Sequence, residues 1–287
     1  MQARAARRPK GGDVRASRPT KAARARGDRG GTDRRTKSVG RPTVVNRREW
    51  DRTSDWYERR NRRTLQRERA EAWGCFRVPE ATARWLPPVR EADVLELGCG
   101  AGRWGLSLRR RGAHIVGLDQ SREQLRRARR LAVRRRARFP LVRANAERIP
   151  FRDGSFDLVF CDWGAMTFAD PRRTVPECAR VLRPGGHLVF STGSWLGLVG
   201  WDPARDRLTR TLRSPYFGPI DRWVGRMVEY RPGPGEWIDL FVENGFVVER
   251  MSETRPPAGA RTTYMSREDV RWARSWPTEM IWRVRRA

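Results

Sequence analysis

Short apolar runs alternate with amphipathic stretches over residues 92–192. The runs that are typical of strands are residues 94–97, 114–118, 141–142, 156–161 and 187–191. The stretches with helical spacing are residues 103–111, 121–136 and 174–182. Ser121 can cap the second of these helices, because Gln124 follows three residues later. Strands that alternate with helices at this spacing predict an α/β fold with a parallel sheet and right-handed crossovers.

The flanking regions follow a different pattern. Trp50, Tyr57 and Leu65 lie about two helical turns apart among charged residues, which predicts one or two amphipathic helices over residues 50–71. Residues 193–235 are rich in aromatic residues, glycine and proline. The remaining expected elements are a helix over 236–244 and strands over 246–251 and 279–284. About 240 residues suffice for one domain with a sizeable core.

Composition separates the N-terminus from the rest. The 287 residues contain 62 Lys+Arg and 33 Asp+Glu, a formal net charge of +29. Residues 1–45 carry 14 of the basic residues, three aspartates and no aromatic residue. Such a segment cannot bury enough apolar surface to offset its ordering entropy, so we expect a disordered basic tail and a folded domain over 46–287. The tail is either solvated, an over-extended start or an arm that binds nucleic acid.

A charge this high favours nucleic acid or an anionic membrane surface as a partner. Only three of the basic residues are lysines, however, and such a bias toward arginine is typical of a GC-rich genome. Part of the charge is therefore a coding effect. The arginines of residues 122–138 are interpreted first as the solvated face of a helix, with Leu125, Ala128 and Ala132 facing inward.

Membrane spans, metal sites and disulfides are not predicted. Residues 184–201 are uncharged, but Pro184 and several glycines interrupt them, so a span is not expected. The four cysteines have no C-x-x-C spacing and only two histidines accompany them, which argues against a structural zinc site. Reduced cysteines and the lack of an apolar leader predict a cytoplasmic protein.

The strongest local motif is Glu-Leu-Gly-Cys-Gly-Ala-Gly over residues 96–102, between an expected strand and an expected helix. Glycines there permit a tight turn and a close approach to a ligand, and the helix N-terminus favours a negative group. Arg103 stands where the dinucleotide fingerprint has its third glycine, which counts against NAD or FAD. Asp119 ends the next strand and can either accept both hydroxyls of a ribose or cap a helix.

Two further motifs follow. Asn-Ala-Glu-Arg-Ile-Pro-Phe over residues 145–151 precedes Asp-Gly-Ser-Phe-Asp over 153–157, and Arg-Val-Leu-Arg-Pro-Gly-Gly spans 180–186. In this order and spacing, the motifs resemble those of class I S-adenosylmethionine-dependent methyltransferases, and most closely the branch that modifies small molecules such as quinone precursors. The resemblance is strong over residues 90–192. It implies a Rossmann-like, seven-stranded sheet whose last strand is antiparallel to the others.

The resemblance also implies how S-adenosyl-L-methionine is held. The three loop glycines would form the turn beneath its methionine part, with Glu96 nearby. Asp119 would bind the ribose hydroxyls, with Gln120 beside the adenine. Asn145 and Ala146 would face the adenine edge, although the family often has aspartate in place of Asn145. The residues implied so far are Glu96, Gly98, Gly100, Gly102, Asp119, Gln120, Asn145 and Ala146.

Cys161 ends the fourth expected strand. The resemblance places it next to the methionine moiety, and a buried apolar strand end is equally compatible. The acceptor is expected beyond the carboxyl ends of the fourth and fifth strands. The aromatic residues of 193–235 would cover it as a lid insertion, or they pack the edge of the sheet. Methyl transfer from a sulfonium needs no metal, and the sequence selects no general base among Asp162, Tyr216 and Tyr264.

The leading hypothesis is therefore methyl transfer to a small-molecule acceptor. An RNA-directed methyltransferase that uses the tail and the Arg-rich helix is the alternative, and a catalytically inactive nucleic-acid-binding protein on the same fold is the third. Residues 161–164 lack the signature of amino-group nucleic-acid methylases, and no proline precedes Cys161 as in cytosine-C5 enzymes. A base-extruding methylase is thus not supported. The acceptor atom and the oligomeric state are not determined by the sequence.

Overall fold

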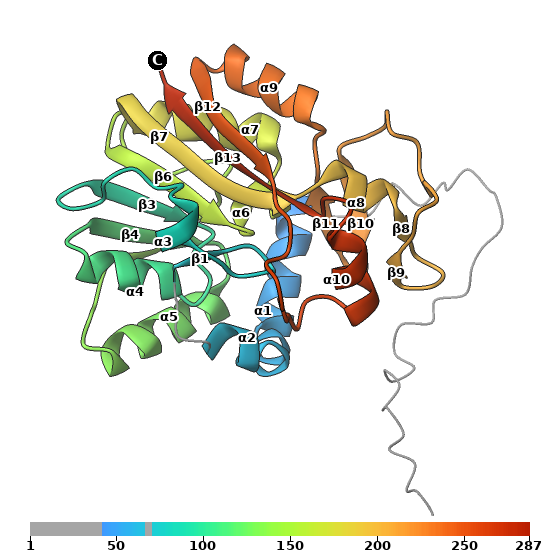
Figure 1. The fold of residues 1–287 in the computed structure, drawn as a ribbon. Helices are drawn as coiled ribbons and strands as arrows, with labels where there is room; N and C mark the ends of the chain where they lie inside the picture. Colours follow the sequence, from blue (N-terminus) through green and yellow to red (C-terminus); the bar gives the residue numbers. More distant parts are fainter. Residues whose placement is uncertain (1–41, 67–70) are drawn as a thin grey trace, which may run out of the picture. The chain divides into compact units, whose positions relative to one another are not determined.

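Seven strands form a mixed central sheet (Figure 1). In their order across the sheet they are β12 (Phe246–Glu253), β13 (Glu279–Arg286), β7 (Leu182–Gly193), β6 (Phe156–Asp162), β3 (Asp93–Leu97), β4 (His114–Asp119) and β5 (Leu141–Arg143). Strand β13 runs antiparallel to both of its neighbours, and the other neighbouring pairs run parallel. The predicted seven-stranded α/β sheet with an antiparallel last strand is confirmed.

This computed structural model describes residues 42–66 and 71–287. The predicted disordered tail therefore lies outside the described residues, except for residues 42–45, which begin helix α1 (Pro42–Arg60). Helix α2 (Arg62–Gln66) follows at once. The spacing of Trp50, Tyr57 and Leu65 predicts one or two helices over residues 50–71, and the structure has two, of which the first begins earlier than expected.

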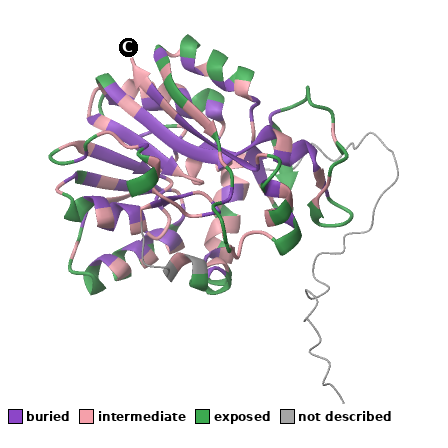
Figure 2. Ribbon diagram, in the orientation of Figure 1, coloured by how far each residue is buried: buried purple, intermediate pink, exposed green. Residues whose placement is uncertain are grey.

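Two apolar layers cover the faces of the sheet, because successive residues of a strand point to opposite sides. One layer packs against α6 (Ala165–Phe168), α7 (Pro171–Val181) and α9 (Pro234–Glu243). The other packs against α3 (Glu80–Ala83), α4 (Arg103–Arg110), α5 (Arg122–Arg134) and the hairpin of β1 (Ala72–Trp73) and β2 (Val78–Pro79). Figure 2 shows the sheet buried between these layers.

The Arg-rich helix α5 has the predicted orientation. Ser121 caps it by accepting a hydrogen bond from the Gln124 N–H at 3.2 Å. Leu125, Ala128 and Ala132 are buried, so the arginines occupy its outer face. This face is the solvated one that the spacing of the apolar residues predicts.

Strand β7 differs from the expectation. It begins at Leu182 rather than at residue 187, directly after α7 ends at Val181. Phe156 pairs with Leu182 and Leu158 pairs with His187, so the segment with Pro184 and two glycines forms an irregularity within the strand. A bulge absorbs extra residues without ending a strand, which explains why proline and glycine did not mark its beginning.

The aromatic insertion, residues 193–235, is a folded extension beyond the end of β7 (Figure 1). It contains α8 (Trp195–Val199), the pair β8 (Trp201–Asp202) and β9 (Arg207–Leu208), and the pair β10 (Asp221–Val224) and β11 (Met227–Tyr230). Helix α10 (Arg267–Ala273) lies against β9. Trp195 and Tyr230 are buried, whereas Tyr216, Phe217 and Trp223 are exposed. Some aromatic residues of the insertion therefore pack inside the fold, and others face outward.

Residues 42–66 and 71–287 contain neither a membrane-spanning helix nor a metal-binding cluster. No helix in these ranges is long and apolar enough to cross a membrane. The same ranges contain no group of three or more His, Cys, Asp or Glu side chains placed to hold a metal ion. All four cysteines are buried as free thiols.

Candidate active site

The glycine loop lies at the carboxyl end of β3, beside the ends of β4 and β6. The N–H groups of Gly98 and Cys99 donate to the Leu118 carbonyl at 2.8 and 2.9 Å. Gly98 has a φ of +71°, and a Cβ added there would lie 2.5 Å from the backbone nitrogen of Ala165. The loop thus touches the turn after β6, and only glycine fits at position 98.

Asp119 connects the glycine loop to the end of β4. Its Oδ2 accepts a hydrogen bond from the Gly100 N–H and its Oδ1 accepts one from the Ser121 N–H, both at 2.8 Å. Burial raises the pKa of this carboxyl to about 6, although both hydrogen bonds act in the opposite direction. Because Ser121 is the cap of α5, the capping interpretation of Asp119 does not apply.

Glu96 faces the α4 side of the sheet. Its Oε2 accepts a hydrogen bond from the Gly105 N–H at 2.9 Å. Burial raises its pKa well above the ordinary value, and the charges of Asp162 and Asp119 act in the same direction. A carboxylate raises the pKa of another carboxyl group only over a short distance. Glu96, Asp119 and Asp162 therefore lie at the same edge of the sheet.

The residues implied at the adenine edge lie on the two turns that follow β4 and β5. The Oε1 atom of Gln120 is buried and has no hydrogen-bond partner within the described part of the chain. Asn145 Oδ1 accepts a hydrogen bond from the Glu147 N–H at 3.1 Å, and Ala146 is buried in the core. A buried acceptor without a donor costs free energy unless a ligand or water supplies one. Gln120 is therefore the residue here that most directly indicates a ligand.

Cys161 lies in the opposite apolar layer from the one that contains Phe160. It is fully buried, and its Sγ accepts a weak hydrogen bond from the Met166 N–H at 3.5 Å. Burial raises the pKa of this thiol to about 12, so it is protonated at neutral pH. Of the two interpretations of Cys161, these contacts favour the buried apolar strand end.

Asp162, one of the three base candidates, lies in a buried polar cluster beside the end of β6, and the other members of this cluster were not predicted from the sequence. Asp162 Oδ1 accepts hydrogen bonds from the Gly74 N–H at 2.8 Å and from Ser191 Oγ at 2.6 Å. Glu279, the first residue of β13, accepts one from the Cys75 N–H at 2.5 Å. Burial raises the pKa of Glu279 to about 7. In the sequence, Glu279 stands out only as a carboxylate at the start of an apolar strand.

Two tyrosines adjoin this cluster. The hydroxyl oxygens of Tyr57 and Tyr264 lie 3.0 Å apart in a hydrogen bond. Burial raises the pKa of Tyr264 to about 12, and the charge of Asp162 contributes in the same direction. Tyr216, by contrast, is exposed on the insertion. Of the three base candidates, Asp162 and Tyr264 therefore lie near each other, whereas Tyr216 lies on the aromatic insertion.

Helix α1 lies across the turns that carry the first three motifs. Its side-chain contacts to these turns are Thr43 with Glu147, Asp51 with Ser121 and Glu58 with Arg103. The first two are hydrogen bonds of 2.7 Å. The helix thus covers the edge of the sheet at which the cofactor is expected.

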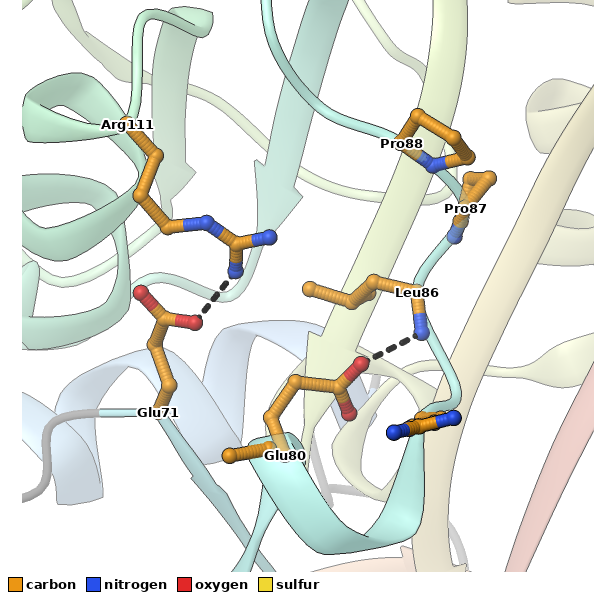
Figure 3. A pocket seen from close by; sticks show the side chains of 8 residues that line it. Glu71, Glu80, Leu86, Pro87, Pro88 and Arg111 are labelled. Atoms are coloured by element: carbon orange, nitrogen blue, oxygen red, sulfur yellow. Dashed lines mark hydrogen bonds and ion pairs between the residues drawn. The ribbon is translucent and has the colours of Figure 1, made fainter.

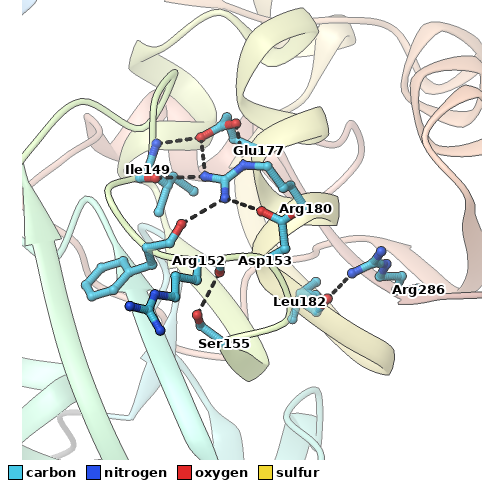
Figure 4. A network of polar contacts seen from close by, with 9 residues as sticks. Ile149, Arg152, Asp153, Ser155, Glu177, Arg180, Leu182 and Arg286 are labelled. Atoms are coloured by element: carbon cyan, nitrogen blue, oxygen red, sulfur yellow. Dashed lines mark hydrogen bonds and ion pairs between the residues drawn. The ribbon is translucent and has the colours of Figure 1, made fainter.

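Arg180 of α7 joins the third and fourth motifs (Figure 4). Its guanidinium donates to the carbonyl oxygens of Ile149 and Phe151 at 2.8 Å and pairs with Asp153 and Glu177. Glu177 also accepts a hydrogen bond from the Ile149 N–H at 2.6 Å. The two motifs therefore form one structural unit that fixes the loop after Asn145.

Arg180→Leu is expected to lower the thermal midpoint by roughly 4–8 °C, because it leaves two carbonyls and two carboxylates without their charged donor, at a cost of about 2 kcal/mol. Arg172→Leu on the same helix is the matched control. It breaks an exposed pair with Asp170 and should shift the midpoint little. Thermal unfolding followed by circular dichroism compares the two, and equal midpoints would contradict the role given to Arg180.

A surface pocket of about 500 Å³ lies elsewhere (Figure 3). Its lining residues are Glu71, Glu80, Ala81, Arg84, Leu86, Pro87, Pro88 and Arg111. None of them is a predicted cofactor residue. Glu80 is committed to internal hydrogen bonds from the Trp73 ring nitrogen and from the N–H groups of Trp85 and Leu86. Its carboxylate therefore serves to hold the surrounding chain.

Comparison with known proteins agrees with this arrangement. Residues 95–190 match the family model described as a methyltransferase domain. An uncharacterized methyltransferase of Mycobacterium tuberculosis is 32% identical over 192 residues, which cover 62% of this chain and 74% of the relative. The demethylmenaquinone methyltransferase of Anoxybacillus flavithermus is 28% identical over 211 residues, which cover 70% and 86%.

The solved structures include a similar fold. The crystal structure of an S-adenosylmethionine-dependent methyltransferase from Mesorhizobium loti superposes with a TM-score of 0.59 and 25% sequence identity. The match covers 72% of this chain and 96% of that one. Together with the glycine loop, the carboxylate that ends β4 and the order of the sheet strands, these similarities show that the chain belongs to the class I S-adenosylmethionine-dependent methyltransferases.

Proposed function

We propose that this methyltransferase transfers the methyl group of S-adenosylmethionine to a small apolar molecule bound beside Asp162. The observation that carries the proposal is the shared edge of the sheet. There the glycine loop and Asp119 adjoin a second, buried polar cluster formed by Asp162, Tyr264 and their neighbours. One half of this edge suits a nucleoside and the other half suits an acceptor.

The residues at the first half fit the cofactor. Gly98, Gly100 and Gly102 all have positive φ and would form the turn beneath the methionine part, with Glu96 nearby. Asp119 would accept hydrogen bonds from the ribose hydroxyls. The unpartnered Oε1 of Gln120 would receive a donor from the adenine side, next to Asn145 and Ala146. Cys161 would contribute apolar packing from below.

When bound, the cofactor supplies an electrophilic methyl group on a sulfonium. The chain's own contribution is alignment and the exclusion of water, which account for several kcal/mol in well-oriented reactions. Burial raises the pKa of Tyr264 from its ordinary value to about 12, so its hydroxyl keeps its proton and can orient an acceptor oxygen by donating a hydrogen bond. Of the three base candidates, Asp162 is the carboxylate at this edge, and it would serve as the base for an acceptor that has to lose a proton.

A small-molecule acceptor is favoured over RNA. One relative is named for methylation of demethylmenaquinone, a small molecule, and none of the similarities reported above favours RNA. In the structure, two arginines of α5 are engaged within the protein, Arg126 with Glu123 and Arg127 with Asp55. The predicted cytoplasmic location stays a prediction.

The deciding experiment is methyl transfer from isotopically labelled S-adenosylmethionine to a cell extract divided into RNA, protein and small-molecule fractions. We expect label in the organic-soluble small molecules. Label that appears in RNA instead would overturn the proposal. Asp119→Ala serves as the control for transfer by other enzymes, because it should strongly reduce the labelling without changing the extract.

The affinity for S-adenosylmethionine is expected to depend on pH. Because the pKa of Asp119 is about 6, the carboxylate is mostly ionised at pH 7.5 and mostly protonated at pH 5. Only the ionised form accepts both ribose hydroxyls, so affinity should fall about tenfold between these pH values. Calorimetric titration measures it. Asp119→Asn should bind weakly with a flatter pH profile, and an unchanged slope would assign the titration to another group such as Glu96.

A further inference from the structure

Exposed apolar side chains concentrate on one part of the aromatic insertion. Among the described residues, eleven large hydrophobic side chains are exposed, and five of them fall within residues 212–224. They are Leu212, Tyr216, Phe217, Trp223 and Val224. Phe217 is 90% exposed, more than any other of the eleven. Single exposed apolar residues are ordinary, whereas a concentration of them marks an interaction surface.

These residues belong to one structural unit, residues 210–226, which we call the aromatic protrusion. Arg222 donates a hydrogen bond to Ser214 Oγ at 2.7 Å, which ties the loop that bears Phe217 to the hairpin that bears Trp223. Beneath them, Ile220, Val228 and Tyr230 form a small core of their own. The exposed rings are therefore presented by an ordered support.

The charge of the aromatic protrusion is positive. It contains Arg210, Arg213, Arg222 and Arg226 but only one acidic residue, Asp221. Arg213 pairs with Asp202 outside the protrusion at 3.1 Å, and the other three arginines keep the net charge positive. Aromatic rings mixed with arginines are the side chains that enter the headgroup region of an anionic bilayer, where rings bury their apolar bodies and guanidinium groups meet lipid phosphates. The net charge of +29 on the whole chain attracts it to the same surface.

The aromatic protrusion is connected to the candidate active site at its base. Arg231, directly after β11, places its guanidinium 5.7 Å from the centre of the Trp163 ring, and Trp163 is the neighbour of Asp162. Asn46 of α1 also holds β11. Its side-chain oxygen accepts a hydrogen bond from the Val228 N–H at 2.8 Å, and its side-chain nitrogen donates one to the Val228 carbonyl at 2.7 Å. The surface that bears the exposed rings thus flanks the acceptor half of the site.

We propose that the aromatic protrusion docks the enzyme on the surface of an anionic lipid bilayer, so that an apolar acceptor reaches the site from the membrane. The docking stands on the exposed rings and their charge, and the delivery of the acceptor rests on the proposed function. The enzyme would lie on the bilayer without spanning it. A bilayer is favoured over a protein partner because the positive charge of the protrusion and of the whole chain matches an anionic lipid surface.

The test is flotation of the full chain with vesicles of phosphatidylcholine alone or mixed with phosphatidylglycerol. We expect binding only to the mixed vesicles, and a fall of about tenfold or more in the partition coefficient of the Phe217→Ser, Trp223→Ser double variant. Ile238→Ser, Val242→Ser is the matched control, since it removes two exposed apolar side chains from α9. Substitution by serine leaves the charge of the basic tail and of the arginines unchanged.

Equal partitioning of the double variant and wild type would overturn the proposal, as would equal binding to both vesicle types. A dimer in light scattering that the double variant abolishes would assign the surface to a second copy of the chain instead. Cofactor binding is measured on the same samples by calorimetry and should be unchanged. Loss of cofactor binding or of methyl transfer in wild type, with vesicle binding intact, would refute the proposed function and leave the docking in place.

Discussion

Gly98→Ala is expected to remove S-adenosylmethionine binding, whereas Gly100→Ala is expected to weaken it less than about tenfold. Both glycines have positive φ, so alanine at either position carries a backbone cost of about 1 kcal/mol. They differ in their surroundings. A Cβ on Gly98 would lie 2.5 Å from the Ala165 backbone nitrogen, whereas the nearest atom to a Cβ on Gly100 is Gln124 Oε1, at 3.9 Å.

Backbone cannot rotate away as a flexible side chain can, so the Gly98 substitution must separate the turn after β3 from the turn after β6. That displacement moves the loop implied beneath the methionine part of the cofactor. Calorimetry with S-adenosylmethionine and S-adenosylhomocysteine measures binding, and circular dichroism checks that each variant is folded. Similar affinities for the two variants would show that the contact between the turns does not shape the site.

Asp119→Ala is expected to reduce the affinity for S-adenosylmethionine by about a hundredfold or more. Each hydrogen bond to a charged group contributes about 1.5–3 kcal/mol, and the variant loses those that Asp119 would make with the ribose. It also leaves the N–H groups of Gly100 and Ser121 without their acceptor, which loosens the glycine loop. Both effects act in the same direction.

The matched control is Asp239→Ala, which removes an exposed carboxylate from α9 and should leave affinity unchanged. Asp119→Asn should fall between wild type and the alanine variant, because an amide oxygen can still accept one of the backbone hydrogen bonds. Competitive binding of S-adenosylhomocysteine provides the measurement. An affinity within threefold of wild type would mean that another residue holds the ribose.

The sheet and the helices beside it were predictable because their signals are local. The apolar run before the glycine loop marks β3, and Ser121 with Gln124 marks the start of α5, each from residues that are neighbours in the chain. The start of β7 was not predictable from Pro184 and the adjacent glycines. These residues usually end an element, and only pairing with β6 shows that they form a bulge inside one.

The sequence by itself determined the fold class and the position of the glycine loop, because turns, caps and strand periods depend on residues a few positions apart. The cofactor was implied by the resemblance of the four motifs to those of a known family. Only the tertiary structure decided that Asp162 meets Gly74 and that Tyr264 meets Tyr57, contacts that join residues 88 and 207 positions apart. It also decided which aromatic residues of the insertion are buried and which face outward. Composition counts rings but does not place them, since burial depends on what the rest of the chain packs against them.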